Sequence, residues 1–286
     1  MKHWNIRQPD ITRQKILTDS LGVSPVTAQL LINRKLSGLD QAKTFLSGTI
    51  SELYNPFLME GMHEAVSRIK KAIENKEKIL IHGDYDVDGV TSIALLIYTF
   101  RSFGVDVSYY IPDRLTEGYG LSKGGVEEAI KIGATLVITV DCGISSNEEV
   151  DSLRNKNIDV IITDHHEVPD IPPQAYAIVN PRMKNCAYPD KNLAGVGIAF
   201  KLAEALCSIL KSSEVWRHFD LVSLGTVADI VPLTGENRII VKEGMKLLNN
   251  GTHKVGLKAL IEASGLKDKP LGSFAISYIL GPRINA

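Results

Sequence analysis

The sequence predicts an α/β protein with a parallel sheet of five or more strands flanked by helices, a helical N-terminal part and a helical C-terminal extension. Three observations support this prediction. From Lys78 onward, short β-branched and aliphatic runs alternate with helical stretches, which is the pattern of βαβ units. These runs lack polar alternation, as is typical of strands covered on both faces. Before Lys78 and after Gly195 the apolar residues follow helical periods.

The elements follow in order along the chain. Residues 1–56 have short helical apolar periods and end at Asn55-Pro56, and residues 62–77 place Ala65, Val66, Ile69 and Ile73 on one helical face. We expect strands at 79–81, 107–111, 136–140, 160–163 and 177–179. Between these strands we expect helices at 90–103 and 148–153 and one that begins near residue 122. Later helices are expected at 198–210, 215–227, 244–248 and 257–263. We expect three parts, with boundaries at 56/57 and 235/236.

Composition excludes several classes of protein. With 286 residues and 44% hydrophobic side chains, the chain can bury a core and is not disordered. It has no apolar run near the roughly 20 residues that span a bilayer, and Met1–Asn5 open no signal peptide. Three cysteines without a CxxC spacing argue against disulfides or a thiolate zinc site. We therefore expect a cytoplasmic protein without a membrane partner. The net charge of −1 does not by itself suggest a nucleic-acid partner.

Carboxylates and imidazoles follow three of the predicted strands. The strand at 79–81 leads into His82, Asp84, Asp86 and Asp88, the strand at 136–140 into Asp141, and the strand at 160–163 into Asp164, His165 and His166. Parallel strands joined by right-handed crossovers bring their carboxyl ends to one edge, where ligands bind. A single aspartate after a strand is more often a helix cap. Three aspartates within five residues repel one another unless cations neutralise them, so this group predicts a metal site.

The ligand types indicate which metal. Carboxylates with imidazole and without thiolate suit Mn²⁺ or Mg²⁺. One ion would leave carboxylates unpaired, so we expect two ions about 3.5–4 Å apart, the arrangement of enzymes that activate water for attack on phosphorus. Asp84, Asp86, Asp88 and Gly89 also match the first half of a calcium-binding EF-hand loop, but its twelfth position is Leu95 instead of Glu.

These residues resemble the DHH phosphoesterase superfamily. The matching segments are HGDYDVDG at 82–89, VDCG at 140–143, DHH at 164–166 and GTVADIVPL at 225–233, the last of which supplies Asp229. Within the superfamily the resemblance is closest to the RecJ family of bacterial single-stranded-DNA-specific 5′→3′ exonucleases. It rests there on RLTEGYGL at 114–121, NPR at 180–182, LAGVGIAFKL at 193–202 and GPRINA at 281–286. The resemblance makes residues 57–235 the DHH domain.

The resemblance and the chemistry together imply roles. Asp141 would bridge two ions, His82 and Asp84 would complete one site, and Asp86, His165 and Asp229 the other. His166 would contact the scissile phosphate or support the ligands beside it, and Asp88 and Asp164 would orient neighbouring groups. Candidate substrate contacts are Arg114, Arg182 and Lys201, each of which also fits a surface charge, and Tyr119, which would stack on a base or pack within its loop.

The resemblance implies metal-dependent release of 5′-mononucleotides from single-stranded DNA in DNA repair and recombination. Two alternatives stay open: a DHH enzyme of small substrates (nano-RNA, cyclic dinucleotides or pyrophosphate), and a non-catalytic DHH scaffold. RecJ-type enzymes continue into a DHHA1 domain; we expect this chain to be without it and residues 236–286 to lead to it. We therefore expect weak DNA affinity and weak activity. A single-stranded-DNA-binding protein and a helicase are expected as partners of the full-length protein.

Overall fold

The structure is a computed structural model, and it describes residues 8–285. The chain divides into two compact units between Leu53 and Tyr54. This division lies close to the expected boundary at 56/57, while the boundary at 235/236 stays a prediction. No helix among the described residues is long and apolar enough to span a membrane.

The first unit is a small helical unit with its own core. Its elements are α1 (Ile11–Leu21), α2 (Pro25–Asn33), α3 (Leu39–Ser47) and the short 3₁₀ turn η1 (Ile50–Glu52). Asp10 and Ser24 cap the first two helices through their side chains. The helices bury the apolar side chains of Leu17, Ala28, Leu31, Leu36 and Ala42.

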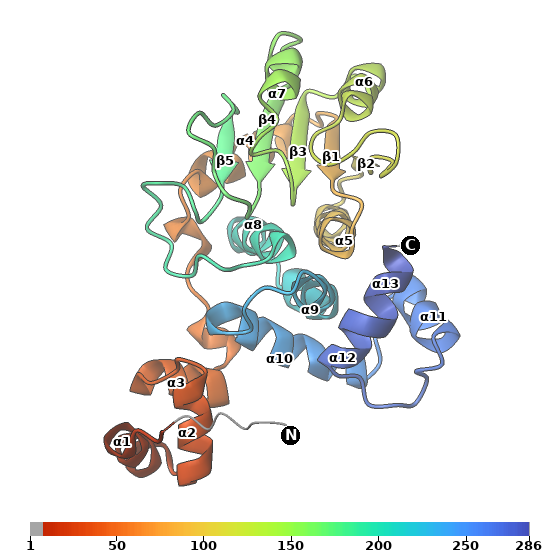
Figure 1. Ribbon diagram of the computed structural model, residues 1–286. Coiled ribbons are helices and arrows are strands. Elements are labelled where there is room, and N and C mark those ends of the chain that lie inside the picture. Colours follow the sequence, from red (N-terminus) through yellow and green to blue (C-terminus); the bar gives the residue numbers. More distant parts are fainter. Residues whose placement is uncertain (1–7, 286) are drawn as a thin grey trace. The chain divides into compact units, whose positions relative to one another are not determined.

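The second unit is built on a parallel five-stranded sheet, as predicted. Its strands lie in the order β2-β1-β3-β4-β5, and every neighbouring pair is parallel. In Figure 1 the arrowheads of the sheet point toward the same edge. The strands are β1 (Ile79–Gly83), β2 (Ser108–Tyr110), β3 (Leu136–Val140), β4 (Asp159–Thr163) and β5 (Ala177–Val179).

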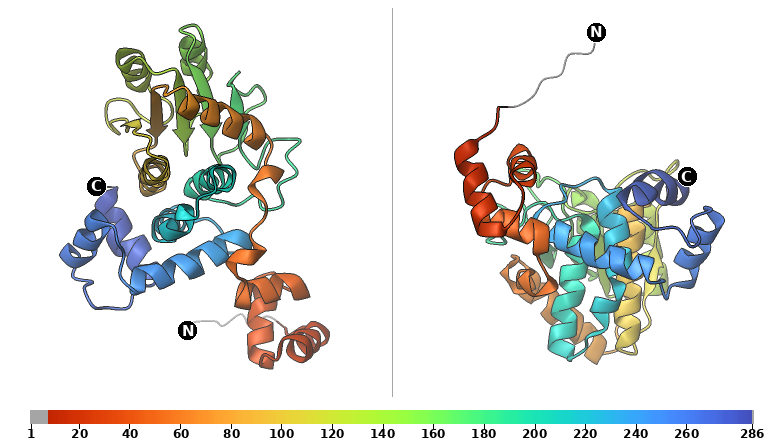
Figure 2. Two further views of the ribbon diagram at one scale, coloured as in Figure 1. Left: turned by 180° about the vertical axis from the view of Figure 1, so that it is seen from behind. Right: turned by 90° about the horizontal axis from the view of Figure 1, so that it is seen from below.

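Helices cover both faces of this sheet. Leu80, Val137 and Val160 pack toward α6 (Lys123–Ile132) and α7 (Asn147–Arg154) in one apolar cluster. The other face is covered by α4 (Met62–Glu74), α5 (Val87–Ser102) and α8 (Gly195–Leu210), and Figure 2 shows α4 lying across the sheet from behind. The central strands are buried throughout, which explains their continuous apolar runs.

Helices dominate the chain after β5. Besides α8, they are η3 (Glu214–His218), α9 (Phe219–Ala228), α10 (Gly235–Asn249), α11 (Val255–Ala263), α12 (Ser273–Ala275), the π-helical turn η4 (Ile276–Leu280) and α13 (Gly281–Ile284). A separate apolar cluster joins α9 and α10 to this last segment through Leu224, Val241, Ile276 and Leu280.

Several element bounds differ from the expected ones. The helix expected at 90–103 begins at Val87, because the Asp86 side chain caps it by accepting a hydrogen bond from Gly89 N. The strand expected at 107–111 is shorter, as β2. The helix expected at 244–248 is the end of α10, whose first turns contain polar residues that are buried by tertiary contacts, Glu236 and Asn237 among them.

Candidate metal centre

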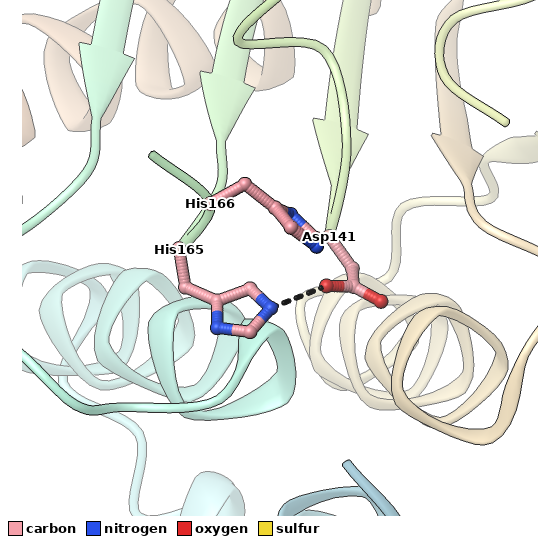
Figure 3. Close-up of side chains that lie close together, drawn as sticks. All are labelled: Asp141, His165 and His166. Carbon is pink, nitrogen blue, oxygen red and sulfur yellow. Dashed lines mark ion pairs between the residues drawn. The ribbon is translucent and has the colours of Figure 1, made fainter. Parts of the chain in front are cut away.

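The carboxyl edge of the sheet gathers side chains from four segments. Asp84 and Asp86 follow β1, Asp141 follows β3, and His165 follows β4. Asp229 arrives from outside the sheet, at the C-terminal end of α9. Figure 3 shows the His165 ring pointing at the Asp141 carboxylate across the gap between two neighbouring strand ends.

The cluster is compact. His165 Nε2 lies 3.1 Å from Asp141 Oδ1, 3.8 Å from Asp229 Oδ2 and 4.0 Å from Asp88 Oδ2. Three groups have ligand atoms within 4.8 Å of one another: Asp84, Asp86 and Asp141; Asp88, His165 and Asp229; and Asp141, His165 and His166. Asp141 thus belongs to two of these groups, which fits two ions that share a ligand.

Several buried polar atoms of the cluster make no hydrogen bond in the part of the chain that the structure describes, although two of them, His165 Nε2 and Asp141 Oδ1, lie 3.1 Å apart. Asp141 Oδ1, His165 Nε2 and Asp229 Oδ2 are buried without any hydrogen-bond partner among the described residues. Buried polar atoms are normally paired, so each of these three calls for an explanation. The same atoms are the ligand types that divalent cations prefer, and they face one another. These residues therefore fit a divalent metal.

The electrostatics of the cluster favour the binding of a cation. Burial raises the pKa of Asp84 to about 6, and burial together with the charge of Asp86 raises the pKa of Asp229 to about 6. The pKa of Asp141 is also raised, first by burial and then by the charges of Asp88 and Asp86. Burial lowers the pKa of His165 to about 4, so its ring is neutral at pH 7. A nearby cation would favour the ionised carboxylates.

Backbone geometry at Asp141 is unusual. Its φ is +59°, in the left-handed region that aspartate tolerates better than most residues. The backbone of Gly195, the first residue of α8, approaches it closely. A Cβ at Gly195 would lie 2.4 Å from Asp141 Oδ1, so no side chain fits there. The glycine that begins α8 therefore lets this helix reach the cluster.

Asp88 and Asp164 accept hydrogen bonds from backbone amides beside the cluster, and their expected supporting role stays a prediction. The Asp88 carboxylate accepts hydrogen bonds from Gly195 N at 2.7 Å and Val196 N at 2.8 Å, which fixes the start of α8. The Asp164 carboxylate accepts from three backbone amides and approaches His166 Nδ1 at 2.7 Å. The hydrogen bond to Asp164 raises the pKa of His166.

His166 and Tyr119 form the exposed side of the cluster. The Tyr119 hydroxyl lies 2.8 Å from His166 Nδ1 and 3.3 Å from the carbonyl oxygen of Asp141. The His166 side chain is 43% exposed, unlike that of His165 at 9%. His166 is therefore the imidazole that a substrate can reach.

Two of the three cationic candidates lie near the cluster. The Arg114 guanidinium lies 4.6 Å from the centre of the Tyr85 ring, next to Asp84 in the sequence. Arg182 pairs with the exposed Glu167, and its charge contributes to lowering the pKa of His165.

The expected roles of Lys201 and His82 are corrected by the structure. Lys201 is fully buried and its Nζ lies 2.9 Å from Glu236 Oε1, so it cannot reach a phosphate. His82 is buried within β1, its Nε2 accepts from Ser122 N at 3.3 Å, and its Nδ1 faces Cys142 Sγ at 3.7 Å. None of the ligand groups among the described residues contains it. In the pleat of β1, His82 lies on the same side as Leu80, toward α6, and thus away from the edge.

A groove adjoins the cluster beyond His166. It has a volume of about 520 Å³, and its lining includes Tyr119, Gly120, Gly143, Ser145 and Glu149. A larger cavity of about 750 Å³ lies between the end of α10, α11 and residues 264–271, and its lining residues do not belong to the cluster.

Two features near the cluster were given no role in the sequence analysis, although both residues lie in segments of the family resemblance. Ile230 directly follows Asp229 with a φ of +61° and an 83% exposed side chain, although a β-branched residue is strained in this region. Asn285 contacts the loop that begins with Asp84 through Val87 N. A β-branched residue at a left-handed position and a contact across 198 residues are both invisible to periodicity.

Comparison with known proteins identifies the family model that the chain matches. The model is the DHH family, N-terminal domain, and it covers residues 78–226, slightly more than half of the chain. This range contains β1 to β5 and every cluster residue except Asp229.

Two curated relatives are single-stranded-DNA-specific exonucleases named RecJ. The one from Bacillus subtilis (strain 168) is 43% identical over 283 residues, which are 99% of this chain and 35% of the relative. The one from Escherichia coli (strain K12) is 40% identical over 240 residues, or 80% of this chain and 42% of the relative. The chain thus spans well under half the length of these relatives.

Solved structures agree with this relationship. A crystal structure of RecJ from Thermus thermophilus in complex with Mn²⁺ matches 97% of this chain and 39% of its own chain, with a TM-score of 0.81 and 30% identity. A crystal structure of exonuclease RecJ bound to manganese matches 79% of this chain and 57% of its own, with a TM-score of 0.72 and 36% identity.

Proposed function

This chain belongs to the DHH family, and on that premise we propose that it hydrolyses single-stranded DNA from the 5′ end, with two Mn²⁺ or Mg²⁺ ions, in DNA repair and recombination. The observation that carries the proposal is the set of buried side-chain atoms on Asp141, His165 and Asp229 at the sheet edge that have no hydrogen-bond partner among the described residues. The relatives named as RecJ exonucleases, and the RecJ structures solved with Mn²⁺, support the same activity.

Asp84, Asp86 and Asp141, whose ligand atoms form one group, would hold one ion. We assign the other ion to His165 with Asp141 and Asp229, whose carboxylate oxygens lie 3.1 Å and 3.8 Å from His165 Nε2. Two divalent ions there would neutralise the carboxylates, polarise the phosphodiester and activate a water for attack on phosphorus. Asp88 would fix the start of α8 against the cluster.

The exposed groups would bind and orient the substrate. His166, whose pKa is raised by Asp164, would present a positively charged ring to a non-bridging oxygen of the scissile phosphate. Tyr119 would hold this ring in place through its hydroxyl. Arg114 and Arg182 would contribute further N–H donors to phosphate oxygens on either side. The groove beyond His166 would receive a nucleoside, since its Glu149 and Glu167 carboxylates disfavour a second phosphate.

The experiment that tests the proposal compares substrates. The chain is incubated with Mn²⁺ and a 5′-labelled single-stranded oligonucleotide, its double-stranded form, pyrophosphate, a cyclic dinucleotide or a dinucleotide. We expect release of labelled mononucleotide from the single strand. Hydrolysis of the small substrates alone would support a small-substrate DHH enzyme instead. A chain without any turnover that still binds single strands would support a scaffold.

Location and partners follow from the same proposal. We infer that the chain acts in the cytoplasm, together with a single-stranded-DNA-binding protein and a helicase that supply its substrate. Adding a single-stranded-DNA-binding protein to the assay tests the first partnership. An unchanged rate, with the substrate coated and uncoated, would argue against it.

A further inference from the structure

The end of the described chain contacts the loop that carries the first two carboxylates. Asn285 follows α13, and its side-chain Oδ1 accepts a hydrogen bond from Val87 N at 3.0 Å. Its backbone carbonyl accepts a second hydrogen bond from Arg114 Nη1 at 3.1 Å. One residue thus holds two segments of the candidate metal centre that lie 27 residues apart in the sequence.

The bond to Val87 N acts on the turn between the carboxylates. Val87 is the first residue of α5, between Asp86 and Asp88, and its amide is one of those that a helix start leaves without an internal partner. The Asp86 side chain satisfies the amide of Gly89. With Asn285 on Val87, the first turn of α5 is therefore capped twice, and the backbone that follows Asp86 is fixed.

The bond to Arg114 acts on a cation beside the cluster. The Arg114 guanidinium lies 4.6 Å from the centre of the Tyr85 ring and also donates to the Asn285 carbonyl. These two contacts restrict the long Arg114 side chain, which lies on an exposed loop. A side chain without such contacts would lose more rotamer entropy on binding a phosphate. The guanidinium has further N–H groups for an anion.

Core packing holds Asn285 in place. Ile276 and Leu280, just before α13, share an apolar cluster with the buried side chain of Val87. Gly281 lies beside α5 and α9, where a Cβ would be in ordinary van der Waals contact with Val87 Cγ2 at 3.9 Å and Ala228 Cβ at 3.8 Å. The hydrogen bonds of Asn285 therefore extend a packed contact between the same elements.

We infer that Asn285 is a positioning residue: it sets the Asp84–Asp86 turn for the metal and holds Arg114 ready for a substrate phosphate. This inference rests on the proposed function. It concerns a residue that touches neither ion nor substrate, and acts through Val87 and Arg114.

The test measures Mn²⁺ binding by calorimetry, thermal unfolding, and KM and kcat on a 5′-labelled single strand. For Asn285→Ala we expect about tenfold weaker Mn²⁺ binding, the lower end of the range for residues that orient ligands, and a severalfold higher KM. Asn285→Asp keeps an acceptor for Val87 N, so we expect near wild-type Mn²⁺ affinity. Asn285→Leu keeps the volume without an acceptor and should behave like Asn285→Ala.

A matched control is available in Asn249. Its side chain donates to the Leu271 carbonyl at 3.0 Å and accepts from Leu271 N at 2.8 Å, so it also joins a helix end to a distant segment. It lies outside the metal cluster. Asn249→Ala should lower the melting temperature with Mn²⁺ affinity and KM unchanged.

A double variant tests the route through Arg114. Asn285→Ala keeps the backbone carbonyl that accepts from Arg114 Nη1 but loses the bond from Val87 N that fixes its position. If that position matters for Arg114, Asn285→Ala should raise KM less in an Arg114→Ala background than in the wild type. If Asn285→Ala changes the melting temperature like Asn249→Ala but leaves Mn²⁺ affinity and KM unchanged, Asn285 is structural and the inference is wrong. A wild-type chain that does not bind Mn²⁺ would instead overturn the proposed function, and this inference with it.

Discussion

Two buried clusters of charge in the second unit solve the same problem differently. In the first, Lys201 Nζ lies 2.9 Å from Glu236 Oε1, 3.0 Å from Glu204 Oε2 and 2.8 Å from the Tyr54 carbonyl. Glu236 also accepts from Tyr54 N and from the Tyr188 hydroxyl, so every charge has partners within the protein. Burial of charge is tolerated there because the cation is a side chain.

The second cluster is the candidate metal centre, and it contains no lysine or arginine side chain. Asp84, Asp141 and Asp88 are at most 4% exposed, and the cluster includes buried oxygens without any hydrogen-bond partner among residues 8–285. A protein that pairs buried carboxylates with a lysine in one place and gathers carboxylates without lysine or arginine in another is suited to an external cation at the second place. The cluster without lysine or arginine is thus the better guide to function.

The largest effect is expected from a substitution that disrupts the second cluster. Asp141→Asn removes the ligand that two groups share, so kcat/KM with Mn²⁺ should fall by at least about 10³, or about 4 kcal/mol of transition-state stabilisation. Stability without metal should stay the same or rise, because a buried charge without a partner is removed. Oligonucleotide cleavage and urea unfolding measure the two effects. Unchanged cleavage would contradict the shared-ligand assignment.

The next largest effect is expected from a substitution that disrupts the first cluster. Lys201→Met keeps much of the apolar stem but leaves two buried glutamates without their cation, which should lower the free energy of unfolding by about 3–5 kcal/mol. The Mn²⁺ affinity of the folded fraction should stay that of the wild type. Urea unfolding and calorimetry at a temperature where the variant is folded measure these quantities. If Lys201→Met lost DNA binding but kept full stability, Lys201 would be a substrate contact and its structural role would be contradicted.

The smallest effect concerns pH. Asp84 and Asp229 have a pKa of about 6 in the folded chain, above their ordinary value of 3.8. A carboxyl whose folded pKa is raised contributes stability that is fully present below about pH 4 and is lost as the pH rises to about 6. Without metal, the free energy of unfolding should therefore fall over this window by on the order of 1–2 kcal/mol per carboxyl.

A saturating Mn²⁺ concentration sharpens this prediction. Because the ion binds the ionised carboxylates of the folded chain, stability should then rise between pH 4 and 7 instead of falling. Thermal unfolding at several pH values, with Mn²⁺ or with a chelator, measures both curves. Asp84→Asn should reduce the fall without metal, and an identical curve for this variant would show that Asp84 does not titrate as described.

Much of the site was predictable because it depends on topology. Asp84, Asp141 and His165 follow parallel strands, and all such strands end at one edge, so a correct strand assignment already placed them together. Asp229 lies at the end of a helix and entered through the family resemblance alone. His82 was misplaced although it adjoins the right strand end. Because β1 extends to Gly83, His82 lies within the strand, and its position in the pleat directs its side chain toward α6.

The sequence by itself determined the parallel sheet, the edge where the carboxylates meet, and the acidic, thiolate-free chemistry of the cluster. These follow from periodicity and from residue types next to strand ends, which are local properties. Only the tertiary structure decided which charges are paired. Lys201 lies six residues, or about 9 Å, along α8 from Gly195 and meets Glu236 there, while Asn285 reaches Val87 across 198 residues. Contacts between distant segments depend on how the elements pack, and no local pattern in the sequence records them.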